Sequence, residues 1–286
     1  MSVSVSDWES LRAEAATALE SAFAFIEKHG DELARLRTQV FLQAAPPGQA
    51  VDAVAAGQRA DGSFPGSGPL LAEALGYETP VSLAPPEVTG TLFALGALAD
   101  LKALHHPAVE GAVSFLAARQ AEDGGWGTAP DDEDRIFLTG MLGGFLGRTR
   151  IVRPAVLDGA GRFLEAHWSP ERIEGGRWSR ITAFTHFFTN VHHELSDEAL
   201  QWCGRELERG FRTGRFEAVA VARTLIDCDA AALPGFGVPP DELLAALLRQ
   251  QGGDGGFAEL AAGGPTARVA PSLDAVVAIL ALSAAL

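Results

Sequence analysis

Apolar residues recur along this chain in two kinds of helical segment. Segments 86–103, 133–148 and 271–285 are apolar on nearly every side, whereas segments 107–120 and 240–250 carry charged residues along one side. Helices that are apolar all round are buried inside a protein, and helices with one polar side lie at its surface. The pattern therefore predicts an all-α protein with buried inner helices and partly exposed outer helices.

This alternation continues along the whole chain. Outer helices are predicted near residues 8–28, 47–58, 107–120, 152–167, 197–211 and 240–250, and inner helices near 31–43, 86–103, 133–148, 180–195, 214–228 and 271–285. Six of each kind predict a single closed (α/α)6 toroid, because an open solenoid would expose two apolar ends. We expect one domain over residues 1–286, with a disordered N-terminus at residues 1–6.

A short motif, Q-x-x-D-G-(G/S)-(W/F), follows three of the outer helices. It occupies residues 58–64, 120–126 and 251–257, and a degenerate copy, "EGGRWS", lies at 174–179. Glycine permits a tight reversal of the chain, and the aspartate can accept hydrogen bonds from free amides in the turn. Each copy is therefore predicted to join an outer helix to the next inner helix, with its aromatic ring covering the joint.

Charge and cysteine content limit the partners and the compartment. The chain has 22 basic and 37 acidic residues, a formal charge of -15, so nucleic acid is not an expected partner. Its two cysteines, Cys203 and Cys228, form neither a disulfide framework nor a CxxC pair, which favours a cytoplasmic location. The longest apolar stretch, residues 273–286, is too short to span a bilayer. Contact of this stretch with a membrane surface remains an option that nothing else indicates.

The three motif copies resemble the QW repeats of squalene-hopene cyclases and related class II terpene cyclases, over about residues 49–286. The run "PDDEDRIFLTGMLGGFLG" is similar to the D-x-D-D stretch of that family, and "FTNVHHEL" is similar to an Asn-Val segment in one of its inner helices. The resemblance implies a toroid cavity in which an acid protonates an isoprenoid or another unsaturated small molecule, without a cofactor.

Two features depart from the family. This chain has helices for one toroid, whereas the familiar cyclases pair two helical domains. Glu133 stands where the proton-donating aspartate is expected.

Protein prenyltransferase β subunits share the toroid, but their zinc site needs an Asp-x-Cys pair and a later histidine. Here Asp227 and Cys228 are adjacent and no histidine follows His193, so no metal site is expected.

The acidic run from Asp131 to Asp134 is the candidate catalytic group. Neighbouring carboxyl groups can hold one member neutral while another stays ionised, which suits proton donation. The resemblance implies that Glu133 supplies the acid, with Asp131, Asp132 and Asp134 around it. Acidic residues at a helix N-terminus also stabilise the helix by ~0.5–1 kcal/mol. The sequence leaves both interpretations open.

A second candidate group lies in the segment "TAFTHFFTNVHHELSD". His186, Asn190 and His193 are spaced i, i+4, i+7 and so form one polar stripe on a helix. The stripe is explained by substrate contact in the cavity, by hydrogen bonds to neighbouring helices, or by metal binding through the two histidines. Asp227 lies on another such stripe, where it either faces the cavity or pairs with Arg223.

Aromatic rings complete the candidate site, because their faces can stabilise a cation. We include Phe137, Phe187 and Trp126 among the expected substrate contacts, although each is also explained as core or as the cover of a turn. Together these features predict an acid-initiated cyclisation or rearrangement of a small molecule. The alternatives are a non-catalytic toroid that binds a small apolar ligand or a peptide, and a prenyltransferase-like or metal-assisted enzyme.

Overall fold

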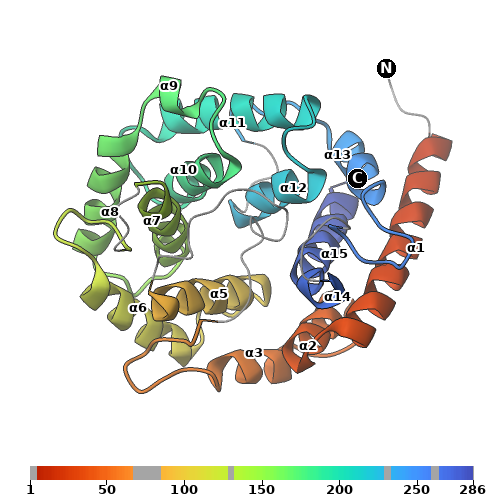
Figure 1. Cartoon of the computed structure of the whole chain (residues 1–286), viewed down its shortest axis with the longest axis horizontal. Coiled ribbons are helices and arrows are strands. Elements are labelled where there is room, and N and C mark those ends of the chain that lie inside the picture. Colours follow the sequence, from red (N-terminus) through yellow and green to blue (C-terminus); the bar gives the residue numbers. More distant parts are fainter. Residues whose placement is uncertain (1–4, 67–84, 128–131, 229–232, 259–263, 286) are drawn as a thin grey trace.

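The computed structural model describes residues 5–66, 85–127, 132–228, 233–258 and 264–285, which contain helices and no strands. The outer helices are α1 (Val5–His29), α3 (Gly48–Ala55), α6 (Pro107–Arg119), α8 (Pro154–His167), α11 (Ser196–Arg212) and α13 (Pro240–Leu248). The inner helices are α5 (Pro86–Asp100), α7 (Asp132–Gly147), α10 (Trp178–Asn190), α12 (Ala218–Asp227) and α15 (Val269–Ala284). Figure 1 shows the outer helices surrounding the inner ones in a ring.

Three further helices complete the described chain. Helix α2 (Glu32–Phe41) packs against α1, α3 and α15, while α9 (Pro170–Ile173) and α14 (Gly264–Ala267) are single turns. Each of the twelve helix ranges expected from the sequence overlaps a helix, so the all-α prediction is confirmed, although α10 ends at Asn190, before the expected end at residue 195. Helix α2, expected to be an inner helix, buries only Ala34 and Thr38. At the N-terminus, α1 begins at Val5, inside the segment expected to be disordered, and residues 1–4 lie outside the described residues.

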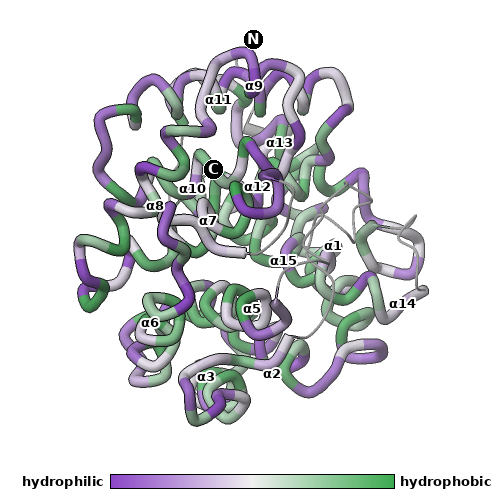
Figure 2. The backbone as a smooth tube through the Cα atoms, turned by 60° about the vertical axis from the view of Figure 1, so that its left-hand side comes forward, coloured by the Kyte–Doolittle hydropathy of each residue, from purple (hydrophilic) through white to green (hydrophobic). Residues whose placement is uncertain are grey.

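The burial of the helices follows their sequence pattern. Along α7, every residue from Ile136 to Leu146 is buried, whereas α11 buries one side and exposes acidic and basic residues on the other. Figure 2 shows the same contrast between the largely apolar α15 and the hydrophilic surface of α11. Burial of apolar surface is the main favourable contribution to folding, so the inner helices form the core of the ring.

The repeated motif makes the same turn in all three full copies. The glutamine amide donates to the glycine carbonyl four residues later and to a carbonyl of the next outer helix in the ring. In the second copy these bonds run from Gln120 Nε2 to Gly124 O at 2.9 Å and to Val156 O at 2.8 Å. Gly124 has a φ of 92°, and a Cβ there would lie 2.0 Å from the Gly159 carbonyl oxygen, so only glycine fits. The aromatic residue of the turn donates its amide to a hydroxyl on the following inner helix, here Trp126 N to Thr139 Oγ1 at 3.0 Å.

The last copy of the motif connects the two ends of the chain. Gln251 Nε2 donates to Gly255 O at 2.9 Å and to Ala18 O of α1 at 2.8 Å. This bond is the counterpart of the one from Gln120 to α8, although its partners are 233 residues apart. The first outer helix therefore takes the place of the next outer helix after the final turn.

Helices α7 and α10 make the closest helix pair of the ring. Their contact is a face of small residues on α7, at Gly140, Gly143, Gly144 and Gly147, which are spaced i, i+3, i+4, i+7. A Cβ on each of these glycines would lie within 2.4 to 2.7 Å of an atom of α10. Glycine thus allows the two backbones to approach, and α10 presents larger side chains to the groove.

Candidate functional site

A cavity of about 150 Å³ lies between the inner helices, and α2 contributes Arg37 to its wall. Its lining comes from Leu92, Phe93, Gly96, Ala97, Asp100, Phe137, Met141, Phe145, Trp178, Arg223, Asp227, Ala270, Leu273 and Asp274. We call it the central cavity. It combines apolar and aromatic side chains with a small number of charged groups, as ligand sites usually do.

Two larger cavities adjoin the central cavity at opposite ends of the inner helices. The N-end cavity, about 430 Å³, shares Arg37, Phe93 and Leu273 with it, and lies by the first turns of α5 and α15. The C-end cavity, about 410 Å³, shares Asp100, Arg223 and Asp227 with it, and lies by the last turns of α5, α12 and α15. The central cavity is thus bordered by larger spaces on both sides.

A cluster of five charged side chains occupies the wall of the central cavity. Arg223 of α12 is its centre: Nη2 lies 2.8 Å from Asp100 Oδ1 and 2.5 Å from Asp227 Oδ1, and Nη1 lies 3.4 Å from Asp274 Oδ1. Arg37 Nη2 lies 2.8 Å from the other oxygen of Asp100. Charged side chains are almost never buried unless they are paired, and here four helices supply the pairs. We call this group the charged cluster.

The three carboxyl groups of the cluster differ in the direction or size of their pKa shifts. Burial acts to raise the pKa of Asp100, but Arg223 and Arg37 outweigh it, so this pKa lies below its ordinary value. Burial raises the pKa of Asp227, against the opposing charge of Arg223. Burial also raises the pKa of Asp274 to about 6, because its arginine contact is longer. The charge of the cluster therefore changes as Asp274 titrates around this pH.

Aromatic side chains supply much of the rest of the central cavity. Phe137, Phe145 and Trp178 all line it, together with Phe93. Trp178 is fixed in place because its Nε1 donates to Ala220 O at 3.2 Å and to Thr224 Oγ1 at 3.1 Å. The expected cavity position of Phe137 therefore agrees with the structure. The rings present faces and edges that can stabilise positive charge in a ligand.

The described members of the acidic run, Asp132, Glu133 and Asp134, do not line these three cavities. Asp131 lies outside the described residues, and the Asp132 side chain is 61% exposed, with its Oδ2 3.6 Å from His167 Nε2. Glu133 forms an ion pair with Arg180 of α10, and Asp134 is buried one turn before Phe137. Asp132 thus connects the start of α7 to α8, and Glu133 connects it to α10. Asp134 is packed in the core. The catalytic role of these residues stays a prediction.

The predicted polar stripe does not continue to His193, because α10 ends at Asn190 and His193 lies in the segment between α10 and α11. His186 packs against Gly144 and against the Phe145 ring, with ring centroids 4.5 Å apart, and Asn190 Nδ2 donates to His186 O at 2.8 Å. Burial lowers the pKa of His186 to about 3, so this imidazole is neutral at physiological pH. His193 lies near the surface, with Nε2 3.9 Å from Glu165 Oε2. Helix packing explains the stripe, and the two histidines do not converge on one site.

Two of the expected aromatic contacts also have structural positions. Phe187 is fully buried against Gly143 in the α7–α10 contact. Trp126 is fully buried in its turn, where Nε1 donates to Leu116 O at 2.8 Å. By contrast, Asp227 lies in the wall of the central cavity, as one of its two sequence interpretations predicted, and it also forms the expected pair with Arg223.

Sequence reasoning missed three members of the charged cluster: Arg37, Asp100 and Asp274. A signal for Asp274 is present in the sequence, because it is the single charged residue of α15, whose other residues are nearly all apolar. A charge at such a position must find a buried partner or change its protonation state. The apolar pattern around Asp274 does not identify Arg223 as its partner, and the patterns of α2 and α5 do not mark Arg37 and Asp100, because the members of the cluster are far apart in the chain.

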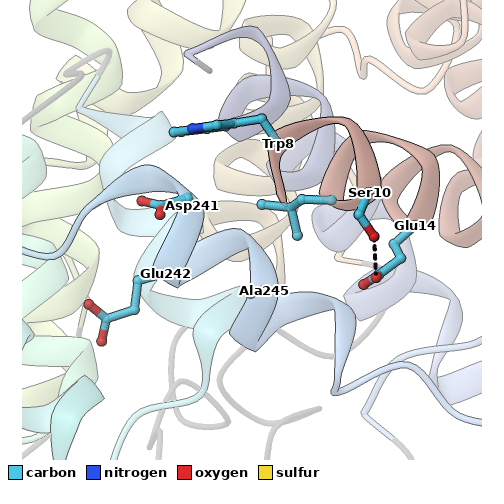
Figure 3. Close-up of a pocket in the computed structure, with 7 residues that line it drawn as sticks. Trp8, Ser10, Glu14, Asp241, Glu242 and Ala245 are labelled. Carbon is cyan, nitrogen blue, oxygen red and sulfur yellow. Dashed lines mark hydrogen bonds between the residues drawn. The ribbon is translucent and has the colours of Figure 1, made fainter. Parts of the chain in front are cut away.

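A groove between α1 and α13, about 300 Å³, lies apart from the central cavity at the outside of the ring. Figure 3 shows its walls, with Trp8, Ser10 and Glu14 on one helix and Asp241 and Glu242 on the other. Ser10 Oγ donates to Glu14 Oε1 at 3.3 Å. The groove has an acidic rim and no buried polar group directed into it, so we place the candidate site at the centre of the ring.

Two searches of the described residues bear on other functional classes. Within the described ranges, no group of three or more histidine, cysteine, aspartate or glutamate side chains is arranged to hold a metal ion. Among the helices that the structure describes, none has the length and apolar character needed to cross a membrane.

The comparisons with known proteins inform us about the fold of this chain and not about its activity. No family model matches the chain, and no curated protein matches it. The crystal structure of a protein from Actinoplanes is similar to this structure, with a TM-score of 0.59 over 94% of this chain and 99% of that chain. The two sequences are 13% identical, so the similarity describes a shared arrangement of helices and carries no activity from one protein to the other.

Proposed function

We propose that the ring is an (α/α)6 toroid and that its central cavity binds a small unsaturated molecule and rearranges it by acid catalysis. The toroid is supported by the alternation of outer and inner helices and by the Gln251–Ala18 bond, which repeats the link between neighbouring outer helices across the chain ends. The sixth inner position belongs to α2, whose Arg37 reaches the central cavity. The reaction class is the one that the resemblance to class II terpene cyclases implies.

One observation carries the chemical part of the proposal: Asp274 lies in the wall of an aromatic cavity with its pKa raised to about 6. At neutral pH about a tenth of such groups carry the proton, which places this carboxyl close to the optimum for acid–base work. Burial in the charged cluster is the cause of the shift. Carboxyl groups whose surroundings push their pKa values apart, as those of Asp100 and Asp274 do here, are the usual arrangement of a general acid and its neighbour.

In the proposed reaction Asp274 transfers its proton to a double bond or an oxygen atom of the bound molecule. The substrate becomes a cation, and Asp274 becomes a carboxylate whose charge Arg223 stabilises. The faces of Phe137 and Trp178 stabilise the cation while its bonds rearrange. The rearranged cation then returns a proton to Asp274, so the product is an isomer and the enzyme regains its starting state. A carboxyl group of this acidity favours an oxygen atom or an electron-rich double bond over an isolated alkene.

The acid is therefore Asp274 in this proposal, and Glu133 is a positioning residue. Glu133 is held in an ion pair with Arg180 and does not line the central cavity, so it is not placed to give a proton to a molecule bound there. The ion pair joins the start of α7 to α10, the two helices that carry Phe137 and Trp178. Glu133 thus acts on the cavity through the helices that form it.

The experiment compares wild type with Asp274→Asn and Glu133→Gln on a panel of unsaturated alcohols, epoxides and phosphate esters. Products are sought by liquid chromatography and mass spectrometry as compounds of unchanged mass and altered retention. We expect Asp274→Asn to lower turnover about 100-fold or more with its far-ultraviolet circular dichroism unchanged, and Glu133→Gln to retain most activity. Equal turnover by wild type and Asp274→Asn refutes the assignment of the acid.

A non-catalytic binding protein is the second candidate function. It is favoured by the mutual pairing of the charged cluster, in which both arginines have carboxylate partners and the helices are held together without a ligand. Under this alternative wild type and Asp274→Asn retain the same co-purified small molecules in native mass spectrometry, and neither converts any member of the panel.

A further inference from the structure

A groove of about 450 Å³ adjoins the C-end cavity and gathers basic side chains in a protein with a net charge of -15. Lys102, Arg148 and Arg150 line it, and His105 and His106 lie beside them. The one carboxylate in the groove wall is Glu110. We call this surface the basic groove. Clefts lined by one sign of charge concentrate the electric field and attract ligands of the opposite sign.

The three cationic groups of the basic groove are not used in internal ion pairs. Among the described residues, no carboxylate forms an ion pair with Lys102, Arg148 or Arg150. The arginines of the inner ring differ, since Arg37 and Arg223 both bind carboxylates. Arg148 acts on Asp227 at longer range, where it lowers the pKa of that carboxyl, and forms no close ion pair with a described carboxylate. Cationic groups of this kind at a cavity wall are available to an anionic group from outside.

Lys102 and Arg148 also line the C-end cavity, so the two spaces share a wall. Asp100, Arg223 and Asp227 of the charged cluster line the side of the C-end cavity that it shares with the central cavity. The rest of its lining is mainly apolar, with Phe41, Ile226, Phe236 and Leu280 among it. At about 410 Å³ it has the size of a small-molecule pocket. Basic groups thus stand at the entrance of an apolar space that leads to Arg223 and the central cavity.

We propose that the ligand of this ring is an amphiphile with an anionic head group, which binds at Lys102 and Arg148 while its apolar body fills the C-end cavity. This inference rests on the proposed small-molecule function, and it names the class of molecule. The head group anchors one end at the basic groove, and the far end of the apolar body reaches the central cavity that holds Asp274. Phosphate and carboxylate share the required charge.

The test measures binding by isothermal titration calorimetry with octyl phosphate, octanoate and 1-octanol, which share one chain length and differ in the head group. We expect octyl phosphate or octanoate to bind wild type about tenfold or more tightly than 1-octanol, and the stronger of the two identifies the head group. Arg148→Gln should weaken binding of that anion about tenfold and Lys102→Gln about threefold, with 1-octanol affinity unchanged.

Arg153→Gln is the matched control. Arg153 is exposed at the start of α8, close in sequence to the basic groove and outside its lining, and its loss changes the net charge equally. Equal binding of the anions and 1-octanol by wild type overturns the proposal, and so does an equal loss of affinity in Arg148→Gln and Arg153→Gln.

The Asp274→Asn variant separates this inference from the proposed function. Asp274 does not line the C-end cavity or the basic groove, so the variant should keep the same ratio between its affinities for the anion and for 1-octanol as wild type, whatever the change in absolute affinity. If Asp274→Asn loses turnover while Arg148→Gln binds the anion as tightly as wild type does, Asp274 remains the proposed acid and the proposed ligand class is overturned. Anion binding that depends on Arg148, together with unaltered turnover in Asp274→Asn, supports the ligand class and refutes Asp274 as the acid.

Discussion

The raised pKa of Asp274 makes the stability of this protein depend on pH in a direction opposite to that of an ordinary paired aspartate. The folded-state pKa is about 6 and the ordinary value is 3.8, so between these values the folded state binds more protons than the unfolded state. The free energy of unfolding therefore falls as pH rises through this window. Asp274 is more favourable to folding below about pH 4 and loses that advantage as pH rises past about 6.

The size of the effect follows from the two pKa values. They correspond to about 3 kcal/mol in total, of which about 2 kcal/mol is lost between about pH 4.5 and about pH 7.5. Asp274→Asn removes the titration and keeps a side chain of nearly the same shape. Relative to wild type, the variant should gain about 2 kcal/mol in free energy of unfolding between these two pH values.

The assay is urea unfolding followed by circular dichroism, at several pH values between these limits, for wild type, Asp274→Asn and the control Asp158→Asn. Asp158 is exposed on α8, so its variant should follow wild type. All other titrating groups are shared, and the difference between variant and wild type isolates Asp274. A difference that is constant with pH, or that reverses sign, refutes the reasoning, because it places an ionised Asp274 in the cluster. A charge retained at such a cost in stability is expected where activity needs it.

Two further predictions concern the ring itself. Gln251→Ala removes the bonds that join the last turn to Ala18, which should lower the free energy of unfolding by about 1–3 kcal/mol and speed hydrogen exchange in α1; unchanged exchange there contradicts the link. Gly144→Ala places a Cβ 2.6 Å from His186 Nδ1 and should cost about 1–3 kcal/mol in thermal or urea unfolding. Gly48→Ala, where a Cβ meets no atom within 4 Å, is its control, and equal effects of the two substitutions contradict the tight α7–α10 contact.

The sequence by itself determined the helices and the joints between them. The difference between all-round and one-sided apolar segments predicted where inner and outer helices lie, because burial acts on each helix through its own periodicity. The motif around Gln120 predicted its turn, since glycine and aspartate act within a few residues of chain. These features depend on local geometry, and local geometry is visible in a linear pattern.

The tertiary structure decided which side chains meet. The sequence left the stripe containing His186 and Asn190 open to cavity contact, helix contact or metal binding, and the glycines of α7 placed these two residues in the helix contact. The charged cluster unites α2, α5, α12 and α15, and no sequence spacing relates Arg37 to Asp274. The pKa of Asp274 depends on its burial and on its distance from Arg223, which are properties of the folded ring. Helices form from neighbours along the chain, whereas a site forms from residues that only the tertiary structure brings together.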